Sequence, residues 1–485
     1  MLLHKMNNKI ENQNIPPLCV DLDGTLVKLD TLHQSILLLI RRKPKSIFKI
    51  IKWIQAGRAS LKEEVTKRVS IDAAHLPYNN KLLNFLKNEK DKGRKLVLVT
   101  GANFRTANAV ANHLQIFDHV MSSSESFNLF GSEKPKMILN KYNEYDYAGD
   151  SIHDLPAFNA ARKKLFVNPS RSLLKYKYDT LIEEKKSKLK SIFESLRINQ
   201  WIKNILIFLP VLLAHKLHQD IFFNQCIIAF FSFSLTASAI YIFNDLLDIS
   251  ADQHHPRKKY RPIAIGNIQI QFAIYMIPLL LISSFLFLHF LPNRESMAFV
   301  LILYILTAFL YSLKFKQIIF FDVILLTLFY NTRIIIGGKC SDTVISSWFF
   351  LFTFFLFLNL ALLKRYGSLV EFNEEKTAQQ ERGYLLKHRK VLKFLGIATG
   401  LFSFLILSMY SFSDQVKILY NNPLFINFTS PLILCWLIRM WKIADKNLMS
   451  NDPLIFASKD FVSYFIFFSI TLLFILGALN SLYRP

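Results

Sequence analysis

A series of long apolar segments between residues 200 and 485 constrains this chain most strongly. Runs of Phe, Leu and Ile alternate there with short polar loops, and hydrophobic residues make up 52% of the sequence. Because a helix needs about 20 apolar residues to cross a bilayer, hydropathy predicts roughly nine membrane spans. The predicted spans cover residues 204–216, 222–243, 270–291, 297–312, 319–338, 345–363, 391–412, 424–441 and 461–482. We therefore expect an all-α, multi-pass membrane bundle, with a first span short enough to be re-entrant.

The basic residues gather in the loops on one side of these predicted spans. The formal net charge of +24 would suit nucleic acid, but the Lys and Arg residues cluster between the apolar segments. This pattern follows the positive-inside rule and suits anionic lipid headgroups, so we expect membrane lipids and no nucleic acid as partners. The first residues, 1–8, lack the apolar core of a signal peptide. We therefore expect an inner (cytoplasmic) membrane protein whose N-terminal part and polar motifs lie on the cytoplasmic side.

An acidic motif directly follows the second predicted span. Asp245, Asp248 and Asp252 are spaced to lie on one face of a continuing helix. Carboxylates at the end of a span are costly unless they are neutralised, and Mg²⁺ prefers oxygen ligands that it shares with phosphates. Basic residues just beyond would hold the remaining phosphate charge. They are Arg257, Lys258, Lys259 and Arg261, with His255 as a further candidate. The sequence thus predicts a diphosphate site at the membrane surface.

Residues 1–185 have the pattern of a soluble α/β domain. Three short apolar runs, 18–21, 95–100 and 145–150, end in polar or Gly residues, as buried parallel strands do. About seventy residues with helical periodicity lie between the first two runs, which predicts a helical cap on a Rossmann-like sheet.

One part of the predicted cap mixes basic and apolar residues. In the stretch 46–54, Lys alternates with Ile, Phe and Trp. Ordinary helix packing is the favoured interpretation, and contact with a membrane surface is the alternative. We interpret residues 186–203 as a basic linker or interfacial helix, followed by a membrane domain over 204–485.

Four polar motifs follow one another along the N-terminal part of the chain. They are Asp21-Leu-Asp23-Gly-Thr25, Thr100-Gly101, a lysine beyond residue 130, and Gly149-Asp150-Ser-Ile-His-Asp154. Together they resemble the haloacid dehalogenase (HAD) superfamily over about residues 15–180. Open α/β sheets place active groups at the C-terminal ends of their strands, where these motifs are expected.

The HAD resemblance implies a role for each motif residue. Asp21 would be the nucleophile that becomes an aspartyl-phosphate, and Asp23 the acid/base. Thr100 and a lysine would bind the phosphoryl group. Asp150 and Asp154 would complete a Mg²⁺ site with the two earlier aspartates. The chemistry is consistent, because a carboxylate attacks phosphorus only where cations neutralise the repulsion between the two anions.

The sequence leaves two choices for the phosphatase lysine. Lys136 is preferred because it opens a helix-like run, and Lys134 is the alternative.

The membrane part carries a second resemblance. The stretches 197–204 and 237–245, followed by Asp248 and Asp252, resemble the UbiA family of membrane prenyltransferases over about residues 190–485. The resemblance implies that Mg²⁺ and the substrate diphosphate bind at Asn244, Asp245, Asp248 and Asp252. A second acidic motif is usual in the family. Here the loop that we assign to it supplies only Asp322, which is predicted to bind metal as well.

Within that family, the chain looks most like the decaprenyl-phosphate phosphoribosyltransferases. The shared stretches are 200–204, 254–264, 311–314 and 333–337. The resemblance implies transfer of 5-phosphoribose from phosphoribosyl diphosphate (PRPP) to a polyprenyl phosphate. Such a site must hold three phosphate-bearing groups, which explains extra cations. The predicted substrate-binding residues are Lys203, Asn244, Arg257, Lys258, Arg261, Tyr311, Lys314 and Arg333.

Several of the cations also have a simpler interpretation. Lys314, Lys316, Lys364 and Arg365 lie near the ends of predicted spans, where long basic side chains commonly reach for water.

A bifunctional enzyme is the hypothesis that uses both halves of the chain. The HAD half would remove the 5-phosphate from the transfer product and give polyprenyl-phosphate-ribose for surface glycans. The main alternative is an aromatic prenyltransferase that uses a polyprenyl diphosphate. A transporter or lipid-binding protein without chemistry is a third. The sequence leaves the oligomeric state open.

Overall fold

The computed structural model describes residues 15–184, 187–374, 383–449 and 452–478. Contacts divide the chain into two structural units. Unit 1 comprises Met1–Ser195 and Ile242–Tyr275, and unit 2 comprises Leu196–Tyr241 and Met276–Pro485. Unit 1 therefore combines the N-terminal part of the chain with the segment that carries the acidic motif.

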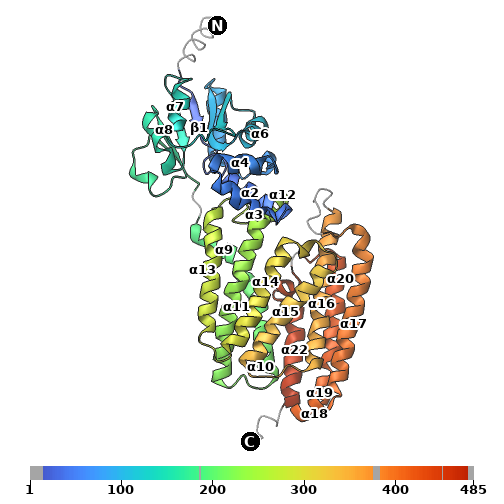
Figure 1. Ribbon diagram of the computed structural model, residues 1–485. Coiled ribbons are helices and arrows are strands. Elements are labelled where there is room, and N and C mark those ends of the chain that lie inside the picture. Colours follow the sequence, from blue (N-terminus) through green and yellow to red (C-terminus); the bar gives the residue numbers. More distant parts are fainter. Residues whose placement is uncertain (1–14, 185–186, 375–382, 450–451, 479–485) are drawn as a thin grey trace. The chain divides into compact units, whose positions relative to one another are not determined.

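A parallel sheet of six strands forms the centre of unit 1 (Figure 1). The strand order is β3-β2-β1-β4-β5-β6, so the chain moves outward from β1 on one side and then on the other. Open α/β sheets bind ligands at the carboxyl ends of the strands where the order reverses in this way. The strands are β1 (Leu18–Val20), β2 (Leu96–Asn103), β3 (His119–Ser123), β4 (Asp146–Gly149), β5 (Lys164–Val167) and β6 (Thr180–Ile182).

Successive side chains of the central strands point to opposite faces of the sheet, and each face has its own buried apolar core. Leu18 and Val20 belong to one buried cluster, and Cys19 between them belongs to the opposite one. Helices cover both faces, so neighbouring strand residues are all apolar. The covering helices are α5 (Asn80–Asp91) and α6 (Phe104–Leu114) on one face, and α7 (Glu133–Leu139) and α8 (Leu155–Ala160) on the other.

The insertion between β1 and β2 is helical. It contains α2 (Thr31–Arg42), α3 (Ser46–Gln55) and α4 (Arg58–Thr66), which share a small apolar core. Leu39, Trp53 and Val65 lie in that core, one from each of the three helices. The predicted α/β domain with a helical cap is confirmed.

Nine helical runs in the described residues are long and apolar enough to span a membrane. In Figure 1 the long helices lie side by side. The eight that follow the first run are α11 (Asp220–Leu247), α13 (Ile270–Leu288), α14 (Arg294–Leu313), α15 (Phe321–Cys340), α16 (Ser347–Glu374), α17 (Arg389–Ser411), α20 (Thr429–Asp445) and α22 (Phe461–Ala478). The run that contains α17 starts at Leu386, and the run that contains α20 starts at Leu424. The predicted multi-pass helical region is confirmed.

The first run is irregular and longer than predicted. It begins with α9 (Lys188–Leu196), breaks at Arg197, whose φ of 52° is left-handed, and continues as a 3₁₀ segment over Ile198–Phe208. α10 (Leu209–Leu213) completes it, with Pro210 in its first turn, where a missing backbone N–H costs little. The predicted start of this span at residue 204 is therefore wrong, because the apolar run is helical from Lys188.

Close packing of α15 against this first run depends on one glycine. A Cβ atom at Gly337 would lie 2.1 Å from the carbonyl oxygen of Ile207 and 3.0 Å from Pro210. The Ile207 oxygen is a backbone atom and the Pro210 atom belongs to a proline ring, so neither can rotate away. Gly367 in α16 is the contrasting case, because a Cβ there has no described atom within 4 Å.

These two glycines predict opposite effects of the same substitution. We expect Gly337→Ala to destabilise the protein by about 1–3 kcal/mol, since overpacking forces the backbone apart. Gly367→Ala should be neutral or stabilising by up to about 1 kcal/mol, the helix-propensity gain of Ala. Thermal unfolding of the two variants in the same detergent measures this. Equal shifts in both variants would contradict the close contact.

Candidate active sites

The HAD-like motif residues of unit 1 meet at the carboxyl ends of the central strands. Asp21 and Asp23 follow β1, Thr100 lies within β2, and Asp150 follows β4. Asp154 ends the short 3₁₀ turn that comes next. Parallel strands end at one edge of a sheet, so motifs that are far apart in the sequence come together there.

Lys134, at the start of α7, is the lysine at this site. Its Nζ donates to Asp21 Oδ1 at 2.8 Å, to Asp154 Oδ1 at 2.6 Å and to the Tyr147 hydroxyl at 3.0 Å. Lys136, which the sequence favoured, instead pairs with Glu133 on the surface, where 67% of its side chain is exposed. The preference for Lys136 is therefore corrected: the two lysines lie two residues apart on a helix, so they point in different directions.

Burial dominates the electrostatics of this site. It raises the pKa of Asp21 and of Asp23 to about 7, and that of Asp150 to about 8. Lys134 opposes the rise at Asp21, while the charge of Asp21 adds to the rise at Asp150. Burial alone would lower the pKa of Lys134, but the carboxylates of Asp21 and Asp154 outweigh it and raise that pKa. One ammonium group is thus shared among several buried carboxylates.

The carboxylates fit a divalent cation. Asp21, Asp150 and Asp154 offer oxygen atoms that all lie within 4.8 Å of one another. Asp154 Oδ2 is buried and has no hydrogen-bond partner among the described residues. Such a set of oxygen donors suits Mg²⁺. Asp23 lies outside this group, and its Oδ1 accepts from the backbone N–H of Thr31 at the start of α2.

The turn after β1 needs glycine. Gly24 has a φ of +82°, and a Cβ atom there would lie 2.5 Å from Asp150 Oδ2. Only a residue without a side chain combines this backbone with so close an approach. The next residue, Thr25, donates its hydroxyl to Asp150 Oδ1 at 3.0 Å. The Asp-Gly-Thr sequence thus positions Asp150 as well as Asp23.

Thr100 is buried beneath the site, and a cap lysine that the sequence analysis missed lies beside it. Thr100 Oγ1 accepts from the backbone N–H of Ala102. Lys62 of α4 donates to the carbonyl of Gly101 and to Asn128 Oδ1. Burial lowers the pKa of Lys62, against the raising effect of Asp23. Lys62 sits in the middle of the helical insertion, where no motif spacing distinguishes it from the other lysines.

The acidic motif of unit 1 lies where α11 ends. All three of its carboxylates are buried, and Asp252 belongs to the short helix α12 (Ile249–His254). Arg261 Nη1 donates to Asp245 Oδ1 at 3.0 Å and to Asp252 Oδ2 at 2.6 Å. Asn244 Nδ2 donates to Asp248 Oδ2 at 3.0 Å. Arg261 therefore joins Asp245 to Asp252, and Asn244 is paired with Asp248.

This group also has free capacity for a cation. Asp252 Oδ1 is buried and has no hydrogen-bond partner in the described part of the chain. Burial raises the pKa of Asp252 to about 7, although Arg261 acts to lower it. Oxygen donors of this kind suit Mg²⁺.

The cap of the α/β domain contributes to the same group. Arg41, at the end of α2, forms an ion pair with Asp248 at 3.5 Å, and Gln34 donates to Gln253 at 2.8 Å. No sequence motif signals either contact.

The remaining basic candidates of unit 1 lie in the loop after α12. The backbone N–H groups of Arg257 and Lys258 donate to His255 Nδ1 at 3.2 and 3.4 Å. These bonds hold the loop that leads to Arg261. The role of Arg257 and Lys258 in substrate binding stays a prediction.

Asp452 organises the buried cations of unit 2, and the sequence analysis missed it. Lys203 and Lys364 donate to Asp452 Oδ2 at 2.8 and 2.6 Å, and the Tyr330 hydroxyl lies 3.4 Å from both carboxylate oxygens. Burial would raise the pKa of Asp452, but the two ammonium groups outweigh it and hold that pKa far below its usual range. The signal was present: buried lysines need an acid, and this loop supplies one.

Asp322 is an ion-pair partner and not an open metal ligand. It is fully buried, and its two oxygens accept from Arg365 and from the Tyr384 hydroxyl. Arg365 also donates to the Tyr311 hydroxyl at 3.0 Å. The prediction that Asp322 binds Mg²⁺ is corrected for this reason. Arg365 is buried as well, so it does not reach for water at a helix end.

A third cation, Arg333, is held by uncharged groups. Its Nε donates to Asn204 Oδ1 at 2.8 Å, and Asn204 donates in turn to Ser234. The guanidinium lies over the ring of Phe233, 4.6 Å from the centroid. Lys314 is exposed where α14 ends, whereas the neighbouring Lys316 is buried. The structure therefore buries Lys203 and Arg333 in the interior of unit 2, leaves Lys364 partly exposed, and leaves Lys314 at the surface.

Comparison with known proteins identifies the membrane part. A family model described as the UbiA prenyltransferase family matches residues 205–459, more than half of the chain. The chain belongs to this family. An uncharacterised protein of Sinorhizobium fredii, y4nM, is 32% identical over 461 residues, which cover 93% of this chain and 89% of that protein.

Other similarities cover parts of this UbiA-family chain. The decaprenyl-phosphate phosphoribosyltransferase of Corynebacterium glutamicum is 34% identical over 185 residues, 37% of this chain and 54% of that protein. The predicted resemblance to that group is confirmed. The solved structure of a HAD family hydrolase from Salmonella enterica serovar Typhi aligns with 37% of this chain and 75% of its own, at 17% identity and a TM-score of 0.27. The likeness of unit 1 to HAD phosphatases rests on its strand order and its site.

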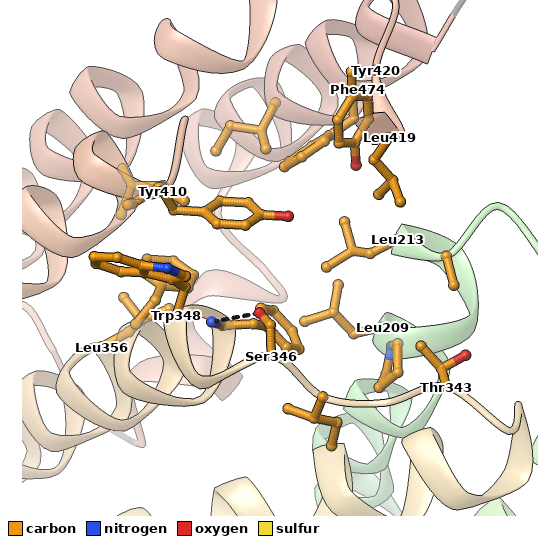
Figure 2. Close-up of a pocket in the computed structure, with 18 of the residues that line it drawn as sticks. Leu209, Leu213, Thr343, Ser346, Trp348, Leu356, Tyr410, Leu419, Tyr420 and Phe474 are labelled. Carbon is orange, nitrogen blue, oxygen red and sulfur yellow. Dashed lines mark hydrogen bonds between the residues drawn. The ribbon is translucent and has the colours of Figure 1, made fainter. Parts of the chain in front are cut away.

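The UbiA-family half also contains a large apolar cavity. Its volume is about 600 Å³, and its walls come from the first helical run and from α16, α17, α20 and α22. Figure 2 shows Leu209 and Leu213 facing Tyr410 and Trp348 across it. The lining of this pocket suits an apolar ligand.

The two lysines of α7 give a test of the HAD-like site. We expect Lys134→Met to lower the turnover of p-nitrophenyl phosphate by the purified protein at least about 100-fold, because Asp21 and Asp154 lose their cation. Lys136→Met removes only a surface ion pair and should stay within about twofold of the original. Far-UV circular dichroism checks that both variants fold. A larger loss with Lys136→Met would contradict the site described above.

Proposed function

We propose that the membrane half transfers 5-phosphoribose from PRPP to a polyprenyl phosphate, and that the HAD-like half then hydrolyses the 5-phosphate. The transferase lies mainly within residues 204–485 and the phosphatase within 1–185, and the segment 186–203 between them supplies Lys203 to the transferase. We place both sites on the cytoplasmic side of the inner membrane, because the basic loops and the acidic motif share one side of the spans in the sequence.

The observation that carries this proposal is the surplus of cations over carboxylates in unit 2, where Lys203 and Arg333 are buried and Lys364 is partly exposed. Lys203 and Lys364 share one carboxylate, that of Asp452, and Arg333 is held by an amide and a carbonyl. A pocket for an aromatic acceptor and a prenyl chain has little use for such charge. A donor and an acceptor that both carry phosphate need it. The similarity to a decaprenyl-phosphate phosphoribosyltransferase points the same way.

The transfer step needs no general base. An oxygen of the lipid phosphate, already ionised at neutral pH, forms a bond to the anomeric carbon of ribose while the bond from that carbon to the diphosphate breaks. Asp245, Asp248 and Asp252 would hold a Mg²⁺ ion together with the diphosphate, and that ion would supply positive charge for the leaving group. Cationic side chains such as Lys203 and Arg333 orient the other phosphates.

The hydrolysis step uses the carboxylates of unit 1. Asp21 attacks phosphorus, the bond from phosphorus to the ribose oxygen breaks, and Asp23 gives that oxygen a proton. Water then attacks the aspartyl-phosphate, Asp23 takes a proton from it, and phosphate leaves. Lys134 neutralises the negative charge beside Asp21. Asp21, Asp150 and Asp154 would hold a Mg²⁺ ion, which would supply further positive charge for the phosphoryl group. The products are the dephosphorylated lipid-linked ribose and inorganic phosphate.

Substitution within α11 tests the transfer. Membranes that contain the protein are incubated with Mg²⁺, undecaprenyl phosphate and PRPP labelled in the ribose, and label is followed into the lipid phase. We expect Asp245→Asn to lower this incorporation at least about 100-fold, because the diphosphate loses a metal-binding carboxylate. Asp220→Asn, the same change at the other end of the helix, should leave it unchanged.

Two outcomes would overturn the transfer proposal. One is full incorporation by Asp245→Asn. The other is no incorporation by the unaltered protein, together with prenylation of an aromatic acid from a prenyl diphosphate, which would give the membrane half the alternative function.

Loss of the phosphatase nucleophile tests the second step separately. We expect Asp21→Asn to incorporate as much label as the unaltered protein but to accumulate a lipid product that retains the 5-phosphate, because the amide cannot attack phosphorus. Mass spectrometry of the lipid product distinguishes the two forms. A fully dephosphorylated product from Asp21→Asn would contradict the assignment of this step to unit 1 and leave the transfer proposal standing.

A further inference from the structure

Helix α3 in the cap of unit 1 is apolar on two faces, and only one of them is buried. Ile50 and Trp53 point into the cap core beside Leu39 and Leu61. The core is therefore complete without the rest of the helix. Ordinary packing, the favoured interpretation of this stretch, accounts for the inner face alone.

The outer face exposes four large apolar side chains. The exposed fractions are 46% for Ile47, 75% for Phe48, 53% for Ile51 and 58% for Ile54. Ile47, Ile51 and Ile54 have the i, i+4, i+7 spacing of one helix face, and Phe48 adjoins them. Single exposed apolar residues are ordinary, but a contiguous patch on one short helix marks an interaction site. We refer to these four residues as the outer face of α3.

The charge around this face selects the partner. Residues 31–62 contain eight Lys and Arg and no Asp or Glu. Lys49 and Lys52 of α3 are exposed beside the outer face, and Lys43 and Lys45 precede it, exposed as well. Apolar residues flanked by lysines are the pattern of helices that lie in the headgroup layer of anionic bilayers. The same chain has candidate membrane spans, so the protein would be anchored in a bilayer that α3 could contact.

We propose that α3 is an interfacial helix: its outer face inserts at the boundary between headgroups and acyl chains of an anionic bilayer, and Lys49 and Lys52 contact the lipid phosphates. This contact goes beyond the proposed reactions and does not depend on them. It would keep the phosphatase cap at the surface where any lipid-linked substrate presents its polar end.

Spin labels on the full-length protein test this contact. Cys435→Ser removes the one exposed cysteine, and the three other cysteines are buried. A nitroxide is then placed at Phe48→Cys or Ile51→Cys in α3. Leu139→Cys in α7 is the control, because its native side chain is 44% exposed, close to that of Ile47. The protein is reconstituted in bilayer discs of phosphatidylcholine with phosphatidylglycerol.

The proposal expects the labels on α3 to collide several-fold more often with oxygen, which concentrates in the bilayer, than with a water-soluble nickel chelate. The label at residue 139 should show the reverse. Discs without phosphatidylglycerol should shift the α3 labels toward water, since the bilayer surface loses the net negative charge that attracts the lysines. A depth that does not change would overturn the electrostatic part.

Two further results would overturn the proposal as a whole. Labels on α3 that are as accessible to the nickel chelate as the control would mean that the outer face stays in water. Labels shielded from both reagents and dipole-coupled to each other would mean that a second copy of the chain covers the face.

Discussion

Mutual neutralisation of buried charges is the constraint on which both parts of this protein depend. Moving a carboxylate or an ammonium group out of water destabilises the folded protein by roughly several kcal/mol unless an opposite charge lies beside it. Lys134 therefore lies between Asp21 and Asp154, and Asp452 receives both Lys203 and Lys364. In each case the helices have to pack so that the opposite charges meet.

The balance of charge differs between the two units, and this difference has a chemical consequence. Lys134 and Arg261 each donate to two carboxylates, and a buried carboxylate oxygen of Asp154 and one of Asp252 have no partner among the described residues. Such sites suit a metal cation. In unit 2 the cations outnumber the carboxylates of Asp452 and Asp322, and an excess of positive charge suits phosphate. An enzyme that moves phosphorylated groups requires both kinds of site.

Motifs whose residues are close in sequence could be predicted well, and contacts across the fold could not. The carboxylates Asp245, Asp248 and Asp252 share one helical turn or the next, so spacing alone places them together. The choice between Lys134 and Lys136 depends on which side chain α7 turns toward β1, and the residue pattern of that short helix fits either. Asp322 was assigned to metal because the family resemblance implies a second acidic motif there. Its actual partners, Arg365 and Tyr384, are distant in sequence, so no local pattern revealed them.

The sequence by itself determined the two kinds of architecture, the family of the membrane part and the acidic motifs, because hydrophobic period and local spacing are properties of a contiguous chain. Only the tertiary structure decided which charges neutralise one another. It made Asp452 the partner of two lysines from separate helices, and it buried one face of α3 while leaving the other exposed. Both results depend on packing between distant segments, and no local pattern contains that information.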